Sequence, residues 1–121
     1  MTVSHIKNYE TVQNWWNDVR LLADTFFDAI HHRPADTPAI PVTSLMVYLH
    51  TTTQKLSRQS LPPEGRTAHQ HLLDSMRYLQ LSLAEVIAHN PERSNLHYDA
   101  ACRRFQQAQR ALHQLGVKQV P

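Results

Sequence analysis

Histidine is the residue type in this sequence that most readily suggests chemistry, because imidazole binds metals and transfers protons near neutral pH. The chain contains nine histidines among its 121 residues. Their spacing does not favour a shared metal ion: on a helix, His69 and His71 point about 200° apart, and His31 and His32 diverge by about 100°. The sequence also lacks H-E-x-x-H and paired E-x-x-H motifs, which mark zinc and di-iron sites. We therefore predict no metal, no cofactor and no catalytic histidine.

Cys102 is the single cysteine, so no disulfide can form within the chain. It follows Ala101 beside the apolar stripe of the last periodic segment, where a half-buried cysteine usually serves as a small apolar side chain. Arg103 and Arg104 would lower its pKa only if they faced it, and helical geometry points them elsewhere. No nucleophile-elbow motif occurs, and two isolated glycines cannot form a phosphate-binding loop. These features favour a non-enzymatic protein.

One short segment suggests a different function. Arg66 and His71 form the pattern R-x4-H. This pattern resembles the one that marks the HEPN family of small helical ribonucleases, which are similar to this chain in size and class. In that family an arginine and a histidine line an RNA-cleaving cleft across a dimer. The resemblance covers six residues of this chain, so we keep RNA binding or RNA processing by Arg66 and His71 as the alternative function.

The elements that must position these residues are predicted to be helices. Apolar residues recur at spacings of three and four, which places them on one face of a helix. Prolines separate the periodic stretches, and the low glycine content argues against a protein with many tight turns. The second stretch is the weakest, because its threonine run at 51–53 favours helix poorly and a strand over 44–51 is an alternative. We predict an all-α, antiparallel up-down-up-down four-helix bundle, with helices near 8–32, 43–59, 63–89 and 94–115.

The chain has the length of one domain, so we expect a single domain over 1–121, with frayed ends near 1–6 and 117–121. Twelve basic and ten acidic residues give a net charge of +2, a weak footprint for nucleic-acid binding. No run of about 18 apolar residues could span a membrane. No leader is visible, so a cytoplasmic location is the default expectation.

Large apolar residues outside the main stripes supply the strongest functional signal. Trp15 and Leu22 flank the stripe of the first predicted helix, with Leu21 further out, and Tyr78 and Leu81 lie on the far side of the third. Several such residues on two helices indicate a contact surface. The alternative is that each helix buries more than half of its circumference. We predict an interaction module that binds itself or another protein, with a two-fold homodimer as the commonest form.

Overall fold

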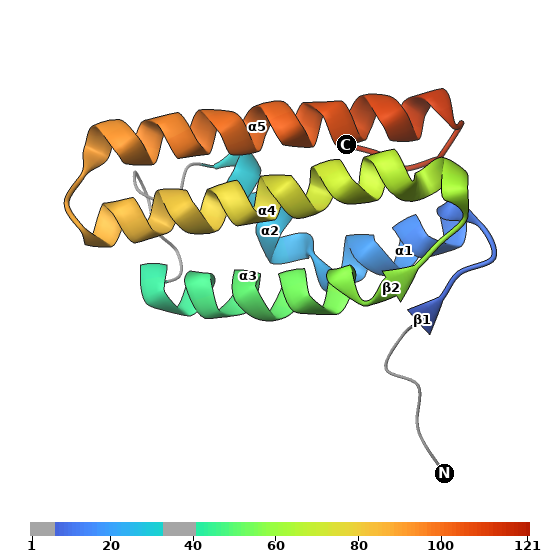
Figure 1. Ribbon diagram of the computed structural model, residues 1–121, viewed down its shortest axis with the longest axis horizontal. Helices are drawn as coiled ribbons and strands as arrows, with labels where there is room; N and C mark the ends of the chain where they lie inside the picture. Colours follow the sequence, from blue (N-terminus) through green and yellow to red (C-terminus); the bar gives the residue numbers. More distant parts are fainter. Residues whose placement is uncertain (1–6, 33–40) are drawn as a thin grey trace, which may run out of the picture.

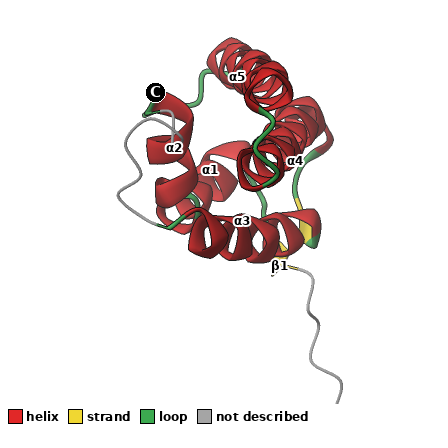
Figure 2. Cartoon of the chain, turned by 90° about the vertical axis from the view of Figure 1, so that its left-hand side faces the viewer, coloured by secondary structure: helices red, strands yellow, loops and turns green. Residues whose placement is uncertain are grey.

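We describe the protein from a computed structural model, in which residues 7–32 and 41–121 can be placed. The all-helical prediction is confirmed. The longest helices, α4 and α5, lie side by side, and α3 runs along α4 (Figure 1). Viewed end-on, α5, α4 and α3 follow one another around the molecule, and α1 and α2 fill the remaining side (Figure 2). In chain order the elements are β1 (Lys7–Asn8), α1 (Val12–Leu22), α2 (Asp24–His31), α3 (Val42–Ser57), β2 (Gln59–Ser60), the 3-10 turn η1 (Pro63–Gly65), α4 (Arg66–Ile87) and α5 (Pro91–Gln114).

Helices α3, α4 and α5 alternate in direction along the chain (Figure 1). This arrangement is compatible with the predicted bundle, with α1 and α2 together standing where its first helix was expected. The threonine run lies inside α3, so the helical interpretation of that segment holds and the strand alternative is wrong. Across the residues that can be placed, no helix has both the length and the apolar character needed to cross a membrane.

The single helix predicted over 8–32 is wrong, because the chain bends at Ala23 and forms two helices. Ala23 has φ −111° and ψ 20°, outside the helical region. Beside the bend, the Tyr48 hydroxyl of α3 donates a hydrogen bond of 2.8 Å to the Leu22 carbonyl. Side chains that bond to the carbonyl ladder are a recognised cause of helix breaks. The bend therefore depends on a residue far along the chain, which local periodicity cannot reveal.

Small residues line the seam between α4 and α5, which we define by six buried positions. On each helix they recur every seven residues, so they form one stripe along the helix. The Ser75 hydroxyl donates to the Ala101 carbonyl at 2.7 Å, and the Ser82 hydroxyl donates to the Ser94 carbonyl at 2.8 Å. Such short side chains let two helices approach closely while their hydroxyls remain hydrogen-bonded. The seam consists of Ala68, Ser75 and Ser82 on α4, and Ser94, Ala101 and Ala108 on α5.

Aromatic side chains from α1 and α2 fill the interior against this pair of helices. Trp15, Trp16 and Phe26 are at most 1 % exposed. Phe26 meets Phe105 of α5 in an edge-to-face contact with ring centroids 5.9 Å apart, a favourable geometry for aromatic pairs. The Tyr98 hydroxyl of α5 donates to the Ile30 carbonyl at 2.8 Å, close to the end of α2. The predicted apolar stripe of the first segment therefore does face the interior.

The ends of the elements differ from the sequence-based expectations. Helix α5 begins at Pro91 instead of near residue 94, because proline fits the first helical turn, where its missing N–H has no partner to lose. Strands β1 and β2 pair in parallel, with Lys7 opposite Gln59, a contact that no sequence pattern indicated. Each strand has two residues, so the pair joins the segment before α1 to the segment after α3 without adding a layer.

Residues 117–121 lie against the helices, which differs from the expected fraying. Gly116 has φ +73°, so the chain reverses direction there. Val117 is 8 % exposed, and the Lys118 amide donates to the Gln13 side-chain oxygen at 2.7 Å. The Trp16 indole N–H donates to the Gln119 carbonyl at 3.1 Å. The other predicted frayed end, 1–6, lies outside the described residues.

Enlarging a seam residue should destabilise the protein far more than the same enlargement on the surface. We expect Ser75→Leu to reduce the free energy of unfolding by about 1–3 kcal/mol, because the leucine must force α4 and α5 apart. Ala84→Leu on the exposed face of α4 is the matched control, and its effect should stay within about 0.5 kcal/mol. Urea denaturation followed by circular dichroism measures both values. Equal effects from the two variants would show that the seam is not closely packed.

Candidate functional site

Two neighbouring hollows lie beside the end of α3 and β2, one toward α1 and the other toward β1 and the start of α4. The first, which we call the Leu21 hollow, has a volume of about 580 Å³. Leu21 is 80 % exposed, the highest value among the large exposed apolar side chains of the described chain. Leu22 beside it is half-buried. The residues that line the hollow are Tyr9, Asp18, Leu21, Leu22, Lys55, Arg58 and Gln59.

The charged groups of the Leu21 hollow come from two helices. Lys55 lies in the last turn of α3 and Arg58 is its C-cap, positions where cations interact favourably with the partial negative charge of a helix end. The Tyr9 hydroxyl donates to Asp18 at 2.9 Å, so that carboxylate is engaged within the chain. The hollow therefore combines two exposed cations with an exposed leucine and a half-buried one. It is suited to bind an apolar side chain that has acidic neighbours.

The second hollow, which we call the Arg66 groove, has a volume of about 730 Å³ and shares Arg58 and Gln59 with the first. No carboxylate is among the described residues that line it. His69 is held in place by two contacts: its Nε2 bonds to the Leu56 carbonyl at 2.8 Å, and its ring packs edge-on against Trp15 at 5.6 Å. The lining residues are Asn8, Ser57, Arg58, Gln59, Ser60, Leu61, Arg66, His69 and Gln70.

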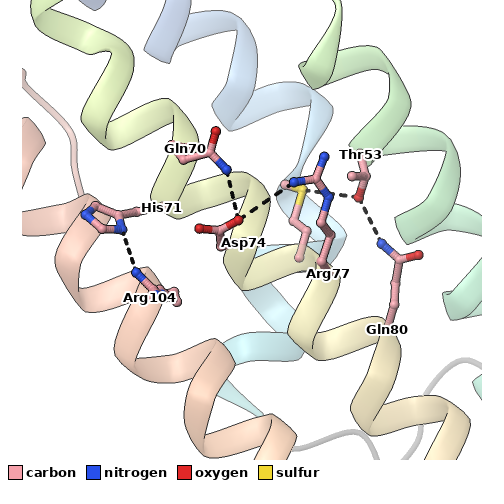
Figure 3. Close-up of polar contacts among 8 residues, drawn as sticks. Thr53, Gln70, His71, Asp74, Arg77, Gln80 and Arg104 are labelled. Atoms are coloured by element: carbon pink, nitrogen blue, oxygen red, sulfur yellow. Dashed lines mark hydrogen bonds and ion pairs between the residues drawn. The ribbon is translucent and has the colours of Figure 1, made fainter.

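Arg66 and His71, the residues of the RNA hypothesis, do not share a hollow within one chain. Arg66 lines the Arg66 groove, whereas His71 lies opposite Arg104 of α5, with His71 Nδ1 and Arg104 Nη1 3.5 Å apart (Figure 3). A cleft formed by both residues would therefore need a second chain. Among the residues the structure describes, no group of three or more histidine, cysteine, aspartate or glutamate side chains could hold a metal ion.

The four predicted interface residues have different environments. Trp15 is fully buried, and its indole N–H donates to the Gln59 side-chain oxygen at 2.8 Å, so it offers no surface to a partner. Trp15 belongs to the buried face of α1 itself, because Val12, Trp15, Trp16 and Val19 follow the helical spacing of three and four. Leu22 lines the Leu21 hollow. On α4, Tyr78 is half-buried and Leu81 is 48 % exposed.

Polar contacts occupy the face of α4 over about three turns before Leu81. The Gln70 amide donates to Asp74 at 2.9 Å, and Arg77 lies 3.7 Å from the same carboxylate (Figure 3). These side chains satisfy one another, so they do not require a partner. Leu81 is then a single exposed apolar residue, which is ordinary on a protein surface. The Leu21 hollow is the stronger candidate for a binding surface.

Sequence reasoning missed Lys55, Arg58 and Gln59, although each lines the Leu21 hollow. Lys55 and Arg58 are three residues apart in sequence, which puts them on the same side of a helix end. That spacing was the available signal. The spacing of Lys55 and Arg58 alone does not indicate a site, because only the fold places Leu21 beside them.

Comparison with known proteins adds no functional information. No protein-family model matches the chain, and neither the curated proteins nor the solved structures include one similar to it. The R-x4-H resemblance therefore still rests on its own six residues. What the protein does must be argued from its surface.

The thiol of Cys102 is placed for packing and not for nucleophilic attack. Burial raises its pKa, and a hydrogen bond with Tyr98 opposes this effect. Asp99 raises the pKa further, while Arg103 lowers it. The thiolate, which is the reactive form, is therefore disfavoured near neutral pH.

Alkylation of Cys102 by iodoacetamide should be several-fold slower in the native protein at pH 8 than in the same chain unfolded in urea. The raised pKa reduces the thiolate fraction, and burial limits access. The rate should rise with pH as the thiol ionises. Arg103→Ala should slow the reaction further, since it removes a charge that lowers the pKa. Mass spectrometry of timed samples measures the rates, and a native rate equal to the unfolded one would contradict this assignment.

Proposed function

We propose that this chain is a non-enzymatic protein-interaction module. Its antiparallel helical bundle presents the Leu21 hollow to an acidic, amphipathic segment of another protein. The observation that carries the proposal is Leu21 itself, which is 80 % exposed in a hollow next to a second leucine and two cations. An anchor residue in a hollow with a charged rim is the arrangement expected of a binding hot spot.

The apolar part of the hollow supplies the driving force. Burying a leucine side chain that was fully exposed contributes about 1.5–3 kcal/mol. The half-buried Leu22 adds to the same patch. A partner that inserts one apolar side chain between them would shield both leucines from water. An amphipathic helix or a short extended segment can present such a side chain.

The charges define the chemistry of the partner. Within residues 7–32 and 41–121, neither Lys55 nor Arg58 is engaged in an ion pair, and Asp18 already accepts a bond from Tyr9. The rim of the hollow is therefore net positive. Acidic residues that flank the anchoring side chain would complement it and speed the encounter.

A homodimer through this surface is the less favourable arrangement. A two-fold contact places the same patch on both subunits. Centred on the Leu21 hollow, it would bring Lys55 and Arg58 of one copy toward their counterparts in the other. Like charges placed face to face oppose association. We therefore favour a different protein as the partner, and self-association becomes one outcome of the experiments.

Leu21→Asp should weaken binding of an acidic amphipathic helix. The probe is a synthetic peptide of leucine and glutamate in helical spacing, titrated into the isotope-labelled full chain and followed by NMR. We expect amide shifts at Leu21, Leu22 and Gln59, and a loss of affinity of about tenfold or more in the variant, because the anchor contact is lost. The same peptide with lysine in place of glutamate should bind much more weakly.

Val47→Asp is the matched control, since Val47 is 67 % exposed on α3 but does not line the hollow. It should leave the affinity unchanged, and an equal loss in both variants would overturn the proposal. Sedimentation of the wild type and of Leu21→Asp tests self-association. If the wild type is a dimer and Leu21→Asp is a monomer, the partner at this hollow is a second copy of the chain and not a different protein. Leu81→Glu tests the other predicted patch in the same assay.

A further inference from the structure

We infer that the Arg66 groove binds a phosphate group carried by the partner segment, which makes the chain a reader of phosphorylated protein. The inference rests on the proposed function for the source of the phosphate, because the partner in the Leu21 hollow would deliver it. The two hollows share Arg58 and Gln59. A segment anchored at Leu21 therefore passes directly into the Arg66 groove.

The charge of the groove is the first argument. Arg58 caps the end of α3 and Arg66 opens α4, so two separate elements direct guanidinium groups toward one concave surface. No carboxylate lines the groove, and neither arginine is engaged in an ion pair in the part of the chain that the structure describes. Arg77 on the outer face of α4 differs, because Asp74 lies beside it (Figure 3). An anion would relieve the repulsion between the two uncompensated cations.

The geometry of the groups favours phosphate over a carboxylate. Guanidinium binds phosphate through two parallel hydrogen bonds, and a phosphomonoester carries close to two negative charges at neutral pH. Polar side chains of Asn8 and Ser60 also line the groove and can donate to further oxygens. His69 lines the same groove, with its Nε2 already bonded to the Leu56 carbonyl and its ring packed against Trp15. A single carboxylate would leave much of this polar surface without a partner.

The same surface is poorly suited to nucleic acid. Single strands are bound by stacking of bases on exposed aromatic rings and by a track of cations along the backbone. Trp15, the aromatic ring next to the groove, is fully buried beneath His69. Among the described residues that line the groove, two are cations, Arg58 and Arg66, and the chain has a net charge of +2. A single phosphate group therefore fits this groove better than the phosphate backbone of a nucleic acid.

The test compares three probes on the isotope-labelled full chain by NMR titration. They are the leucine–glutamate peptide, the same peptide with one phosphoserine beyond its anchor, and inorganic phosphate. We expect phosphorylation to tighten peptide binding by about tenfold or more, with shifts added at His69 and Ser60. Arg66→Ala should remove this gain and leave the affinity of the unphosphorylated peptide unchanged, because Arg66 does not line the Leu21 hollow.

Arg66→Lys should retain part of the gain, since lysine keeps the charge but not the two-pronged geometry. Arg103→Ala on the exposed face of α5 is the charge-matched control and should retain all of it. An equal loss in Arg103→Ala would overturn the inference by showing that only the overall charge matters.

The remaining outcomes separate this inference from the proposed function. If the unphosphorylated peptide binds and phosphorylation adds nothing, the phosphate site is overturned while the interaction module stands. If neither peptide binds, the titration with inorganic phosphate is the remaining test. Amide shifts that are lost in Arg66→Ala support an anion site in the groove, and the absence of such shifts overturns it. Inorganic phosphate binding as tightly as the phosphopeptide would make the ligand a small free phosphate. If an oligouridine strand binds more tightly than the phosphopeptide, the ligand of the Arg66 groove is a nucleic acid, and the inference of a phosphorylated protein is overturned.

Discussion

The close contact between α4 and α5 is the constraint on which the rest of the structure depends. Helices normally keep their axes apart by the width of large side chains, but the buried residues that face this seam are alanine and serine. Serine adds a requirement that alanine does not: each buried hydroxyl must find an acceptor. Ser75 and Ser82 both find one on α5, which fixes how far the two helices can slide along each other.

A seam of small residues buries little apolar surface, so most of the hydrophobic contribution to the stability of the fold comes from other elements. Trp15 and Phe26 supply it from α1 and α2, and Leu49 and Leu56 supply it from α3, all with no exposed surface. These elements cover the α4–α5 pair (Figure 2). The end of α1 and the end of α3 come together there and line one hollow. The Leu21 hollow forms at this junction, and the Arg66 groove lies next to it, between the end of α3, the two short strands and the start of α4. The candidate site is thus a consequence of how the aromatic residues cover the seam.

Periodicity predicted the helices because each stripe is a local property of the sequence. It could not predict the bend at Ala23, where the Tyr48 hydroxyl reaches the Leu22 carbonyl from another helix. The same limit applies to the site. Leu22 was found as an apolar residue beside the stripe, but Arg58 became meaningful only when α3 was placed against α1. Trp15 was assigned to the surface because the predicted stripe was drawn too narrow: Trp15 lies on the same buried face of α1 as Val12, Trp16 and Val19.

The two adjacent tryptophans have a consequence for how the chain folds. Trp15 bonds to a residue 44 positions away and Trp16 to one 103 positions away, so one dipeptide closes two very long loops. Contacts of such high sequence separation form only after the intervening chain has been ordered, and they slow folding. The indole of Trp16 should therefore reach its native environment late, when residues 117–121 dock. Intrinsic fluorescence would report that last step without any added label.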